Sequence, residues 1–308
     1  MFAEEINFHK QRADVFYERV KACVYSNAVR LNCMFAPSEQ PVPFEKRLEL
    51  QYSRLEPGGR WGQNCSSAWF HITGTVPQEF EGLELALIFD PGGESMIFGN
   101  DGIPVCGLTG GSVFSPNYRK TAFRINGSHK AGDKLEFWIE GAANDLFGLV
   151  NPLSFFRETE HPRHAFTGLL GACDLAVFNR EAWNLQLDLQ VLLSLLKALP
   201  EGDWRIRRLL GVLGRAADAW NEDPANSGAA RGILKEFLDL RPSGAVMTAH
   251  GVGHAHIDTG WLWPVRETIR KCARSFSSQL MLIDEYPEYI FGASAAQHYA
   301  FIKENYPG

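Results

Sequence analysis

The sequence lacks the features that mark a secreted, membrane-spanning or nucleic-acid-binding protein. Its start, MFAEEINFHKQRADVF, has no basic segment followed by an apolar one, so we expect no secretory signal. Asp188, Gln190 and Lys197 interrupt the longest apolar-rich stretch, LQLDLQVLLSLLKAL, so we expect no spanning helix and no membrane partner. A basic excess is also missing, because 30 Lys and Arg face 36 Asp and Glu. The resulting net charge of −6 indicates no nucleic-acid partner.

Closely spaced cysteine pairs are lacking too. Scattered single cysteines without an export signal are typical of reduced, mostly buried thiols. We therefore expect no structural disulfide and a cytoplasmic location. The six cysteines, none of them in a CxxC pair, are Cys23, Cys33, Cys65, Cys106, Cys173 and Cys272.

What is present is the composition of an ordinary soluble globular protein, with 45% hydrophobic and 21% charged residues. At roughly 150 residues per domain, the 308 residues indicate about two domains. No internal repeat or low-complexity segment stands out. Changes of periodicity divide the chain into an N-terminal helical arm, a β-sandwich, a helical connector and a final α/β segment. Their predicted bounds are 1–40, 41–150, 151–243 and 244–308.

The helical arm is predicted from apolar residues at three- and four-residue spacing before the prolines of APSEQPVPF. These residues are Phe8, Val15, Phe16, Val20, Val24 and Leu31.

The region 41–150 has the pattern of an antiparallel β-sandwich. Polar and apolar residues alternate in WFHITGTVP, LELALIFD and KLEFWIEGA, and Asn100-Asp101-Gly102 marks a hairpin turn. Trp61, Trp69 and Trp138 are candidates for contact with a sugar. Because Trp69 and Trp138 lie inside alternating strands, we interpret them as core.

The region 151–243 is predicted to be helical, since three stretches repeat apolar residues at helical spacing. They are DLAVFNREAWNLQLDLQVLLSLLKALP, WRIRRLLGVLGRAADAWNE and ARGILKEFLDL. Arg205, Arg207 and Arg208 near the start of the second stretch are interpreted as a solvated face.

The last segment, 244–308, follows a β-α-β-α order. GAVMTAHGVGHAHID indicates a strand, and PVRETIRKCARSFSSQLMLIDEYP a helix with Pro264 in its first turn. EYIFGASAAQHY indicates a short strand that leads into another helix. Since two strands cannot close a barrel, we expect the chain to be the N-terminal part of a longer protein. The predicted fold class is thus multidomain α+β, ending in the first β-α-β-α units of a truncated (β/α) barrel catalytic domain.

The stretch GHAHIDTGWLWP holds the candidate site. His254, His256 and Asp258 stand at alternate positions where a strand gives way to a loop, so they would share one face if the strand continued. Ligands bind at such strand ends, and imidazole and carboxylate suit zinc and its neighbours. The alternative is a polar strand end with satisfied histidines. Trp261 and Trp263 could be core residues, or could stack on a sugar ring.

The same stretch resembles the signature of the α-mannosidases of glycoside hydrolase family 38, in which His-x-His-x-Asp-x-x-Trp opens the catalytic domain. FGASAAQHYAFIKENYPG resembles the second strand and helix of that domain. The sandwich motifs SSAWFHITGTVP and ANDLFG, and the order of the upstream segments, are similar to the cytosolic and bacterial branch. The resemblance covers essentially the whole chain.

The resemblance implies a retaining exo-glycosidase that removes terminal α-linked mannose from oligosaccharides with the help of a divalent metal, usually zinc. By match to the motif, His256 and Asp258 would bind the metal, His254 would support the site and Trp261 would stack under the bound mannose. Gly260 replaces an alanine that is common in this branch. We expect the full-length protein to be a homo-oligomer.

The resemblance also implies that the nucleophile, the acid/base carboxylate and the second metal-binding histidine lie downstream of residue 308. A retaining enzyme needs two carboxylates about 5–5.5 Å apart. We therefore assign no catalytic residue within this chain, interpret Asp284 and Glu285 as solvated helix surface, and expect the chain alone to be inactive and to bind metal weakly or not at all. Two alternatives remain open: a metal-dependent barrel hydrolase acting on amide or ester bonds, and a carbohydrate-binding module without catalysis.

Overall fold

The computed structural model describes residues 3–63, 66–110, 119–144, 167–240, 248–261 and 263–307. The chain divides into two compact units. We name them the helical unit and the β unit. The helical unit comprises Met1–Ala28, Leu83–Leu85 and Ala176–Thr248, and the β unit comprises Val29–Gly82, Ala86–Leu175 and Ala249–Gly308.

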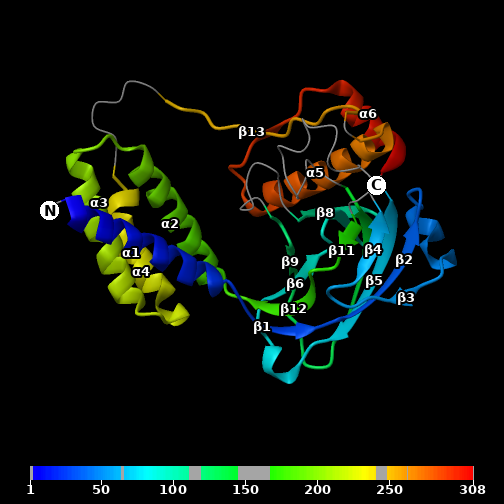
Figure 1. Ribbon diagram of the computed structural model, residues 1–308, viewed down its shortest axis with the longest axis horizontal. Helices are drawn as coiled ribbons and strands as arrows, with labels where there is room; N and C mark the ends of the chain where they lie inside the picture. The colour runs from blue at the N-terminus through cyan, green and yellow to red at the C-terminus, as the bar shows by residue number, and fades with distance from the viewer. Residues whose placement is uncertain are drawn as a thin grey trace, which may run out of the picture. The chain divides into compact units, whose positions relative to one another are not determined.

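Four helices form the helical unit: α1 (Ala3–Ala22), α2 (Arg180–Ala198), α3 (Trp204–Trp220) and α4 (Ser227–Leu238) (Figure 1). A short 3-10 helix, Pro224–Asn226, precedes α4. Capping side chains fix two of the starts, since Asn179 accepts a hydrogen bond from the Ala182 N–H and Asp203 accepts one from the Arg205 N–H. The predicted helices therefore begin where a polar side chain can satisfy the first free N–H groups.

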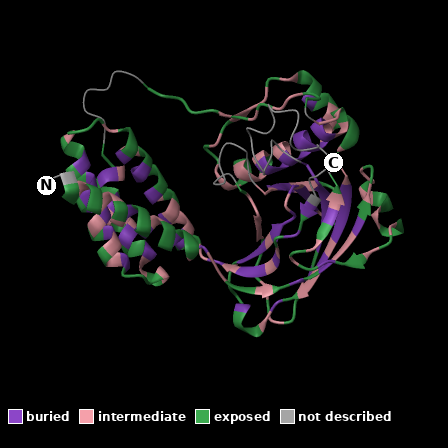
Figure 2. Cartoon of the chain, viewed as in Figure 1, coloured by how far each residue is buried: buried purple, intermediate pink, exposed green. Residues whose placement is uncertain are grey.

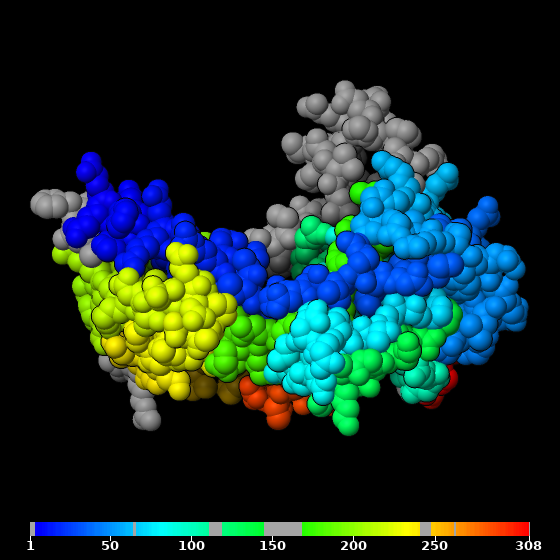
Figure 3. All heavy atoms as spheres, turned by 90° about the horizontal axis from the view of Figure 1, so that it is seen from below, coloured from blue at the N-terminus to red at the C-terminus, as the bar shows by residue number. Residues whose placement is uncertain are grey.

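The N-terminal arm and the helical connector share one core. Phe16, Leu189, Leu213 and Leu234, one from each helix, are buried in the same cluster. The two segments lie side by side, blue against green and yellow (Figure 3), and the buried residues face the inside of the bundle (Figure 2). Segments that the sequence predicts as separate parts are thus one packed unit.

The helical prediction was wrong next to α1 and α2. The chain forms strands β1 (Tyr25–Arg30), β2 (Asn32–Ser38) and β12 (Ala172–Phe178) there. The partner of β2 is β5, whose residues lie far along the chain, so no local spacing indicates the pairing. Phe8 and Val15, two of the apolar residues whose spacing predicted the helix, are exposed on α1.

Most of the strands form two larger sheets. The first has the order β3-β2-β5-β10-β7-β8 and is antiparallel throughout. The second has the order β1-β12-β6-β9, and β11 pairs with β4 in a small antiparallel ribbon. The remaining strands are β3 (Ser53–Arg54), β4 (Arg60–Gln63), β5 (Ser67–Thr75), β6 (Leu85–Asp90), β7 (Glu94–Phe98), β8 (Pro104–Thr109), β9 (Ala122–Ile125), β10 (Lys134–Ala142) and β11 (Thr167–Leu169). Two 3-10 helices, Phe44–Glu49 and Gln78–Phe80, connect them.

The predicted antiparallel sandwich is confirmed. Phe70 of β5 and Phe89 of β6 pack edge to face between the two larger sheets, with ring centroids 5.2 Å apart. The predicted hairpin joins β7 to β8, and Gly102 at its tip has a φ of +82°, which favours glycine.

A helix covers the other face of the six-stranded sheet. This is α5 (Val265–Glu285), whose Ala273 packs in one cluster with Trp69, Met96 and Trp138. Both faces of the central strands are therefore buried. Trp69 and Trp138 are core residues, as the alternation predicts, and Trp61 is buried as well.

The C-terminal segment has the predicted β-α-β-α order. Strand β13 (Gly253–His254) pairs in parallel with β14 (Phe291–Gly292), α5 connects them, and α6 (Ala296–Asn305) follows (Figure 1). Residues 244–247 of the predicted first strand, and 145–148 of the ANDLFG motif, lie outside the described residues. None of the helices in the described part of the chain combines the length and the apolar character needed to cross a membrane.

Candidate functional site

The candidate residues lie on the loop between β13 and α5, which we name the motif loop (residues 255–264). The strand ends at His254, so His256 and Asp258 do not continue its face as the alternation suggested. The loop nevertheless places His256 Nε2 3.2 Å from Asp258 Oδ1. His254 is exposed at the strand end.

The donor chemistry of this pair fits a divalent metal. Two ligand atoms about 2.0–2.1 Å from a tetrahedral zinc lie roughly 3.3–3.4 Å apart, close to the observed separation. Both side chains are open to solvent, with relative exposures of 81% for His256 and 43% for Asp258. Among the residues that the structure describes, no third His, Cys, Asp or Glu completes a cluster. The described residues thus supply two candidate ligands at this point of the loop.

The two tryptophans of the motif loop have different environments. Trp261 is 51% exposed, so the core interpretation does not hold for it. Trp263 is half-buried and meets Trp261 edge to face, with ring centroids 5.6 Å apart. The Lys271 ammonium lies 4.4 Å from the centre of the Trp263 ring. Trp263 therefore packs against the exposed ring of Trp261, three residues after Asp258 in the sequence.

Two side chains outside the motif bind the loop. Thr268, in the first turns of α5, is hydrogen-bonded to three groups of the loop. His298 of α6 is buried, and its Nε2 lies 2.9 Å from Thr259 Oγ1. Sequence reasoning missed both residues, because a hydroxyl or an imidazole inside a helical stretch carries no local sign of its partner.

A buried charge network fixes α5 against the six-stranded sheet. Three carboxylates face three cations, so the charges balance. The members are Glu94, Glu140, Glu267, Arg270, Lys271 and Arg274. Gly107 of β8 permits the close approach, because a Cβ there would lie 2.7 Å from the Arg274 Cβ and 2.8 Å from the Arg274 carbonyl oxygen.

Arg270 lies at one end of this network. Its guanidinium donates to Ser67 Oγ at 2.9 Å and to the Gly141 carbonyl at 2.9 Å, and it lies 3.2 Å from Glu140. A further bond joins it to Glu267, one turn earlier on α5. Burial opposes the charged form, but Glu140 and Glu267 outweigh it and raise the pKa of Arg270.

Glu94 lies at the other end. Its Oε2 accepts hydrogen bonds from Lys271 at 2.6 Å, Arg274 at 2.9 Å and Asn144 at 2.6 Å. Burial alone would raise the pKa of Glu94, but the charges of Lys271 and Arg274, with the Lys271 and Asn144 hydrogen bonds, lower it to about 2. For Lys271, burial outweighs the attraction of Glu94 and lowers its pKa. The carboxylate is therefore ionised at neutral pH and holds the first half of α5.

The two carboxyl groups near the end of α5 differ from each other. Asp284 is exposed, as predicted, whereas Glu285 is half-buried and paired with Arg124 of β9. The interpretation of Glu285 as solvated surface was thus wrong. Its salt bridge explains the residue structurally and gives it no catalytic partner.

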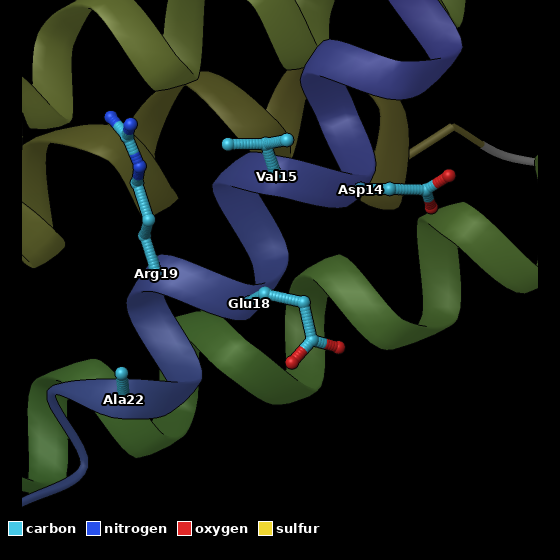
Figure 4. A pocket seen from close by; sticks show the side chains of 5 residues that line it. All are labelled: Asp14, Val15, Glu18, Arg19 and Ala22. Atoms are coloured by element: carbon cyan, nitrogen blue, oxygen red, sulfur yellow. The ribbon is translucent and has the colours of Figure 1, made fainter.

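A shallow hollow lies on the surface of α1. Asp14, Val15, Glu18, Arg19 and Ala22 line it. Figure 4 shows the longer side chains pointing away from one another, and Arg19 pairs with Glu222. Because these groups do not converge on one point, the hollow offers no arrangement for catalysis or metal binding.

Comparison with known families and proteins supports the motif. Residues 27–175 match the family described as "Alpha-mannosidase, jelly roll domain", and residues 246–308 match "Glycosyl hydrolases family 38 N-terminal domain". The chain is 31% identical to Alpha-mannosidase 2C1 of Mus musculus, over 92% of this chain and 26% of that protein. It is 30% identical to Alpha-mannosidase G of Dictyostelium discoideum, over 94% and 26%. A Saccharomyces cerevisiae alpha-mannosidase is 27% identical, over 97% and 28%.

The chain spans about a quarter of the length of the curated relatives that it matches. Among solved structures, a beta-glucuronidase of Faecalibacterium prausnitzii gives a TM-score of 0.29 at 11% identity, over 49% of this chain and 31% of that chain.

Proposed function

Because this chain belongs to glycosyl hydrolase family 38, we propose that it forms the N-terminal part of a metal-dependent, retaining α-mannosidase. The substrate would be an oligosaccharide that ends in α-linked mannose, as the names of its relatives suggest. The observation that carries the proposal is local. A histidine and a carboxylate lie 3.2 Å apart beside an exposed tryptophan, just beyond the end of a parallel strand.

In this proposal, His256 and Asp258 hold a divalent metal, with zinc the best match to their chemistry. The metal would supply positive charge to hydroxyl groups of the terminal sugar. His254, exposed at the strand end, supports the pair. Trp261, half of whose surface is exposed, offers an aromatic ring on which a sugar can stack, and the packing of Trp263 against it limits its movement.

We further propose that the nucleophile and the acid/base group come from sequence beyond residue 308, on strands that extend β13 and β14 into a barrel. The apolar surface of the C-terminal segment supports this, because large apolar side chains are exposed where a larger domain would bury them. They are Val252, Val265, Leu280, Ile283 and Ile290. The 308-residue chain alone is then inactive. The cytoplasmic location and the homo-oligomer remain predictions.

The test uses the complete protein that contains this chain and an aryl α-mannoside as substrate. We expect release of the aryl group, loss of activity with a chelator, and recovery on addition of zinc. Asp258→Ala should abolish the activity. Asp284→Ala, on the exposed end of α5, is the matched control and should leave it unchanged. Full activity of Asp258→Ala would refute the ligand assignment, and hydrolysis of amides or esters in place of mannosides would favour the alternative barrel hydrolase.

The alternative of a sugar-binding module receives no support from the sandwich. Trp61, Trp69 and Trp138, the candidate contact residues, are all buried. These three rings therefore do not form a surface on which a sugar could stack.

A further inference from the structure

The hydroxyl of Thr268 joins three separate points of the motif loop. Thr268 Oγ1 accepts a hydrogen bond from the Gly260 N–H at 2.9 Å and from Trp263 Nε1 at 3.0 Å. It donates to the Asp258 carbonyl at 3.1 Å. A threonine hydroxyl has one proton and two lone pairs, so all of its hydrogen-bonding capacity is used. The side chain is fully buried, and water cannot replace it.

These bonds differ from those of a helix cap. A capping side chain accepts from the first N–H groups of its own helix. Thr268 is the fourth residue of α5, and its partners precede it in the chain by five to ten residues. The start of α5 has no side-chain cap. The hydroxyl therefore stabilises the loop and not the helix.

The three partners surround the residues of the proposed site. One is the backbone of Asp258 itself, and the other two flank Trp261 in sequence. Gly260 has a φ of +65°, so the loop turns sharply between them. We propose that Thr268 is a positioning residue, which sets the direction of the Asp258 carboxylate and of the Trp261 ring. This inference rests on the proposed function, since it concerns the same site.

The support for Thr268 is itself rigid. Lys271, one turn further along α5, contacts both the Trp263 ring and Glu94 of β7. These contacts, the hydrogen bond from Arg270 to Ser67 and the close approach of α5 to Gly107 fix the first half of α5 to the six-stranded sheet. Thr268 thus connects the motif loop to a helix that buried ion pairs hold against the six-stranded sheet. A loop held at three points on a fixed helix loses little freedom when it binds a metal or a sugar.

The test compares Thr268→Val, which keeps the shape but removes the hydroxyl, with Thr268→Ser, which keeps the hydroxyl. Ser277→Ala is the matched control, because Ser277 is a buried hydroxyl of α5 that bonds only to the Arg274 carbonyl. In the complete protein, titration with Zn²⁺ should show an affinity about 10–100-fold weaker for Thr268→Val, as for other groups that orient a metal ligand. Thr268→Ser and Ser277→Ala should remain within about twofold of the wild type.

A second measurement does not depend on metal, activity or the folding of a variant. In the wild-type 308-residue chain, hydrogen exchange followed by NMR should show the Gly260 amide and the Trp263 indole N–H protected, and the indole N–H of the exposed Trp204 exchanging faster. Equal exchange of the two indoles, or unchanged Zn²⁺ affinity in Thr268→Val, would overturn the assignment. If Asp258→Ala also left Zn²⁺ affinity and mannoside hydrolysis unchanged, the proposed function would fail, whatever the exchange data showed about Thr268.

Discussion

At the scale of single residues, tryptophan has opposite roles in the same unit. Trp69 lies on a strand covered on both faces, and its Nε1 donates to the Val42 carbonyl at 2.8 Å. Trp261 lies on a loop and presents half of its surface to solvent. The alternating pattern around Trp69 predicted its burial correctly. A loop has no such period, so the sequence left the environment of Trp261 open.

Replacing each of these tryptophans with alanine should separate stability from function. We expect Trp69→Ala to lower the free energy of unfolding by about 3–5 kcal/mol, because it empties a core site. Trp261→Ala should cost less than about 1 kcal/mol, since it removes an exposed ring with one aromatic neighbour. Denaturant unfolding of the 308-residue chain measures both. In the complete protein, Trp261→Ala should raise the KM for a mannoside about tenfold, equal to about 1.4 kcal/mol of lost contact. Equal destabilisation by the two substitutions would contradict these assignments.

At the scale of elements, helix α5 shows what periodicity can and cannot predict. Its extent, from just after Pro264 to Glu285, follows closely from the apolar spacing and the proline. Its orientation does not, because the buried face carries charged and hydroxyl side chains that resemble a solvent-facing stripe. The carboxylates of Glu94 and Glu140 neutralise this face, and they come from strands more than a hundred residues earlier. No local pattern could reveal that pairing.

The ion pairs of Glu94 with Lys271 and Arg274 predict how the free energy of unfolding depends on pH. The pKa of Glu94 is about 2 in the folded chain and is lowered from 4.5, so the unfolded chain takes up this proton first as the pH falls. The stabilisation is therefore complete above about pH 5 and is lost between about pH 5 and pH 2, by an amount on the order of 3 kcal/mol. Denaturant unfolding of the 308-residue chain at a series of pH values measures it.

Glu94→Gln should remove most of this dependence and destabilise the chain at pH 7 by about 3 kcal/mol or more, because Lys271 loses its carboxylate partner and Arg274 loses the nearer of its two. Glu56→Gln is the control, since the exposed pair of Glu56 with Arg54 should contribute less than about 1 kcal/mol. If the free energies of unfolding of the wild type and of Glu94→Gln changed in parallel from pH 7 to pH 3, the ion pairs of Glu94 would not stabilise the fold.

At the scale of the whole molecule, the sequence predicted the order of the segments better than their grouping. The antiparallel sandwich, the helices and the final β-α-β-α segment follow from the spacing of apolar residues, which repeats every two residues in strands and every 3.6 in helices. The joint core of α1 with α2, α3 and α4 does not, because residues such as Phe16 and Leu213 are brought together only by the tertiary fold. Strands β1, β2 and β12 escaped detection for the same reason, since their partners lie far along the chain.

The roles of the candidate site residues stay predictions. Residue types and spacing identified His256, Asp258 and Trp261, and the resemblance assigned their roles. The supports Thr268, Lys271 and His298 come from packing that only the structure reveals. The described residues bring two candidate metal ligands, His256 and Asp258, onto one loop with the exposed ring of Trp261.

We propose that the motif loop supplies part of a metal site that sequence beyond residue 308 completes. Metal content per chain, measured by mass spectrometry after dialysis against zinc, tests this directly. We expect one tightly bound ion in the complete protein, and none in its His256→Ala and Asp258→Ala variants or in the 308-residue chain alone. Stoichiometric zinc retained by the 308-residue chain, or by either variant of the complete protein, would contradict it.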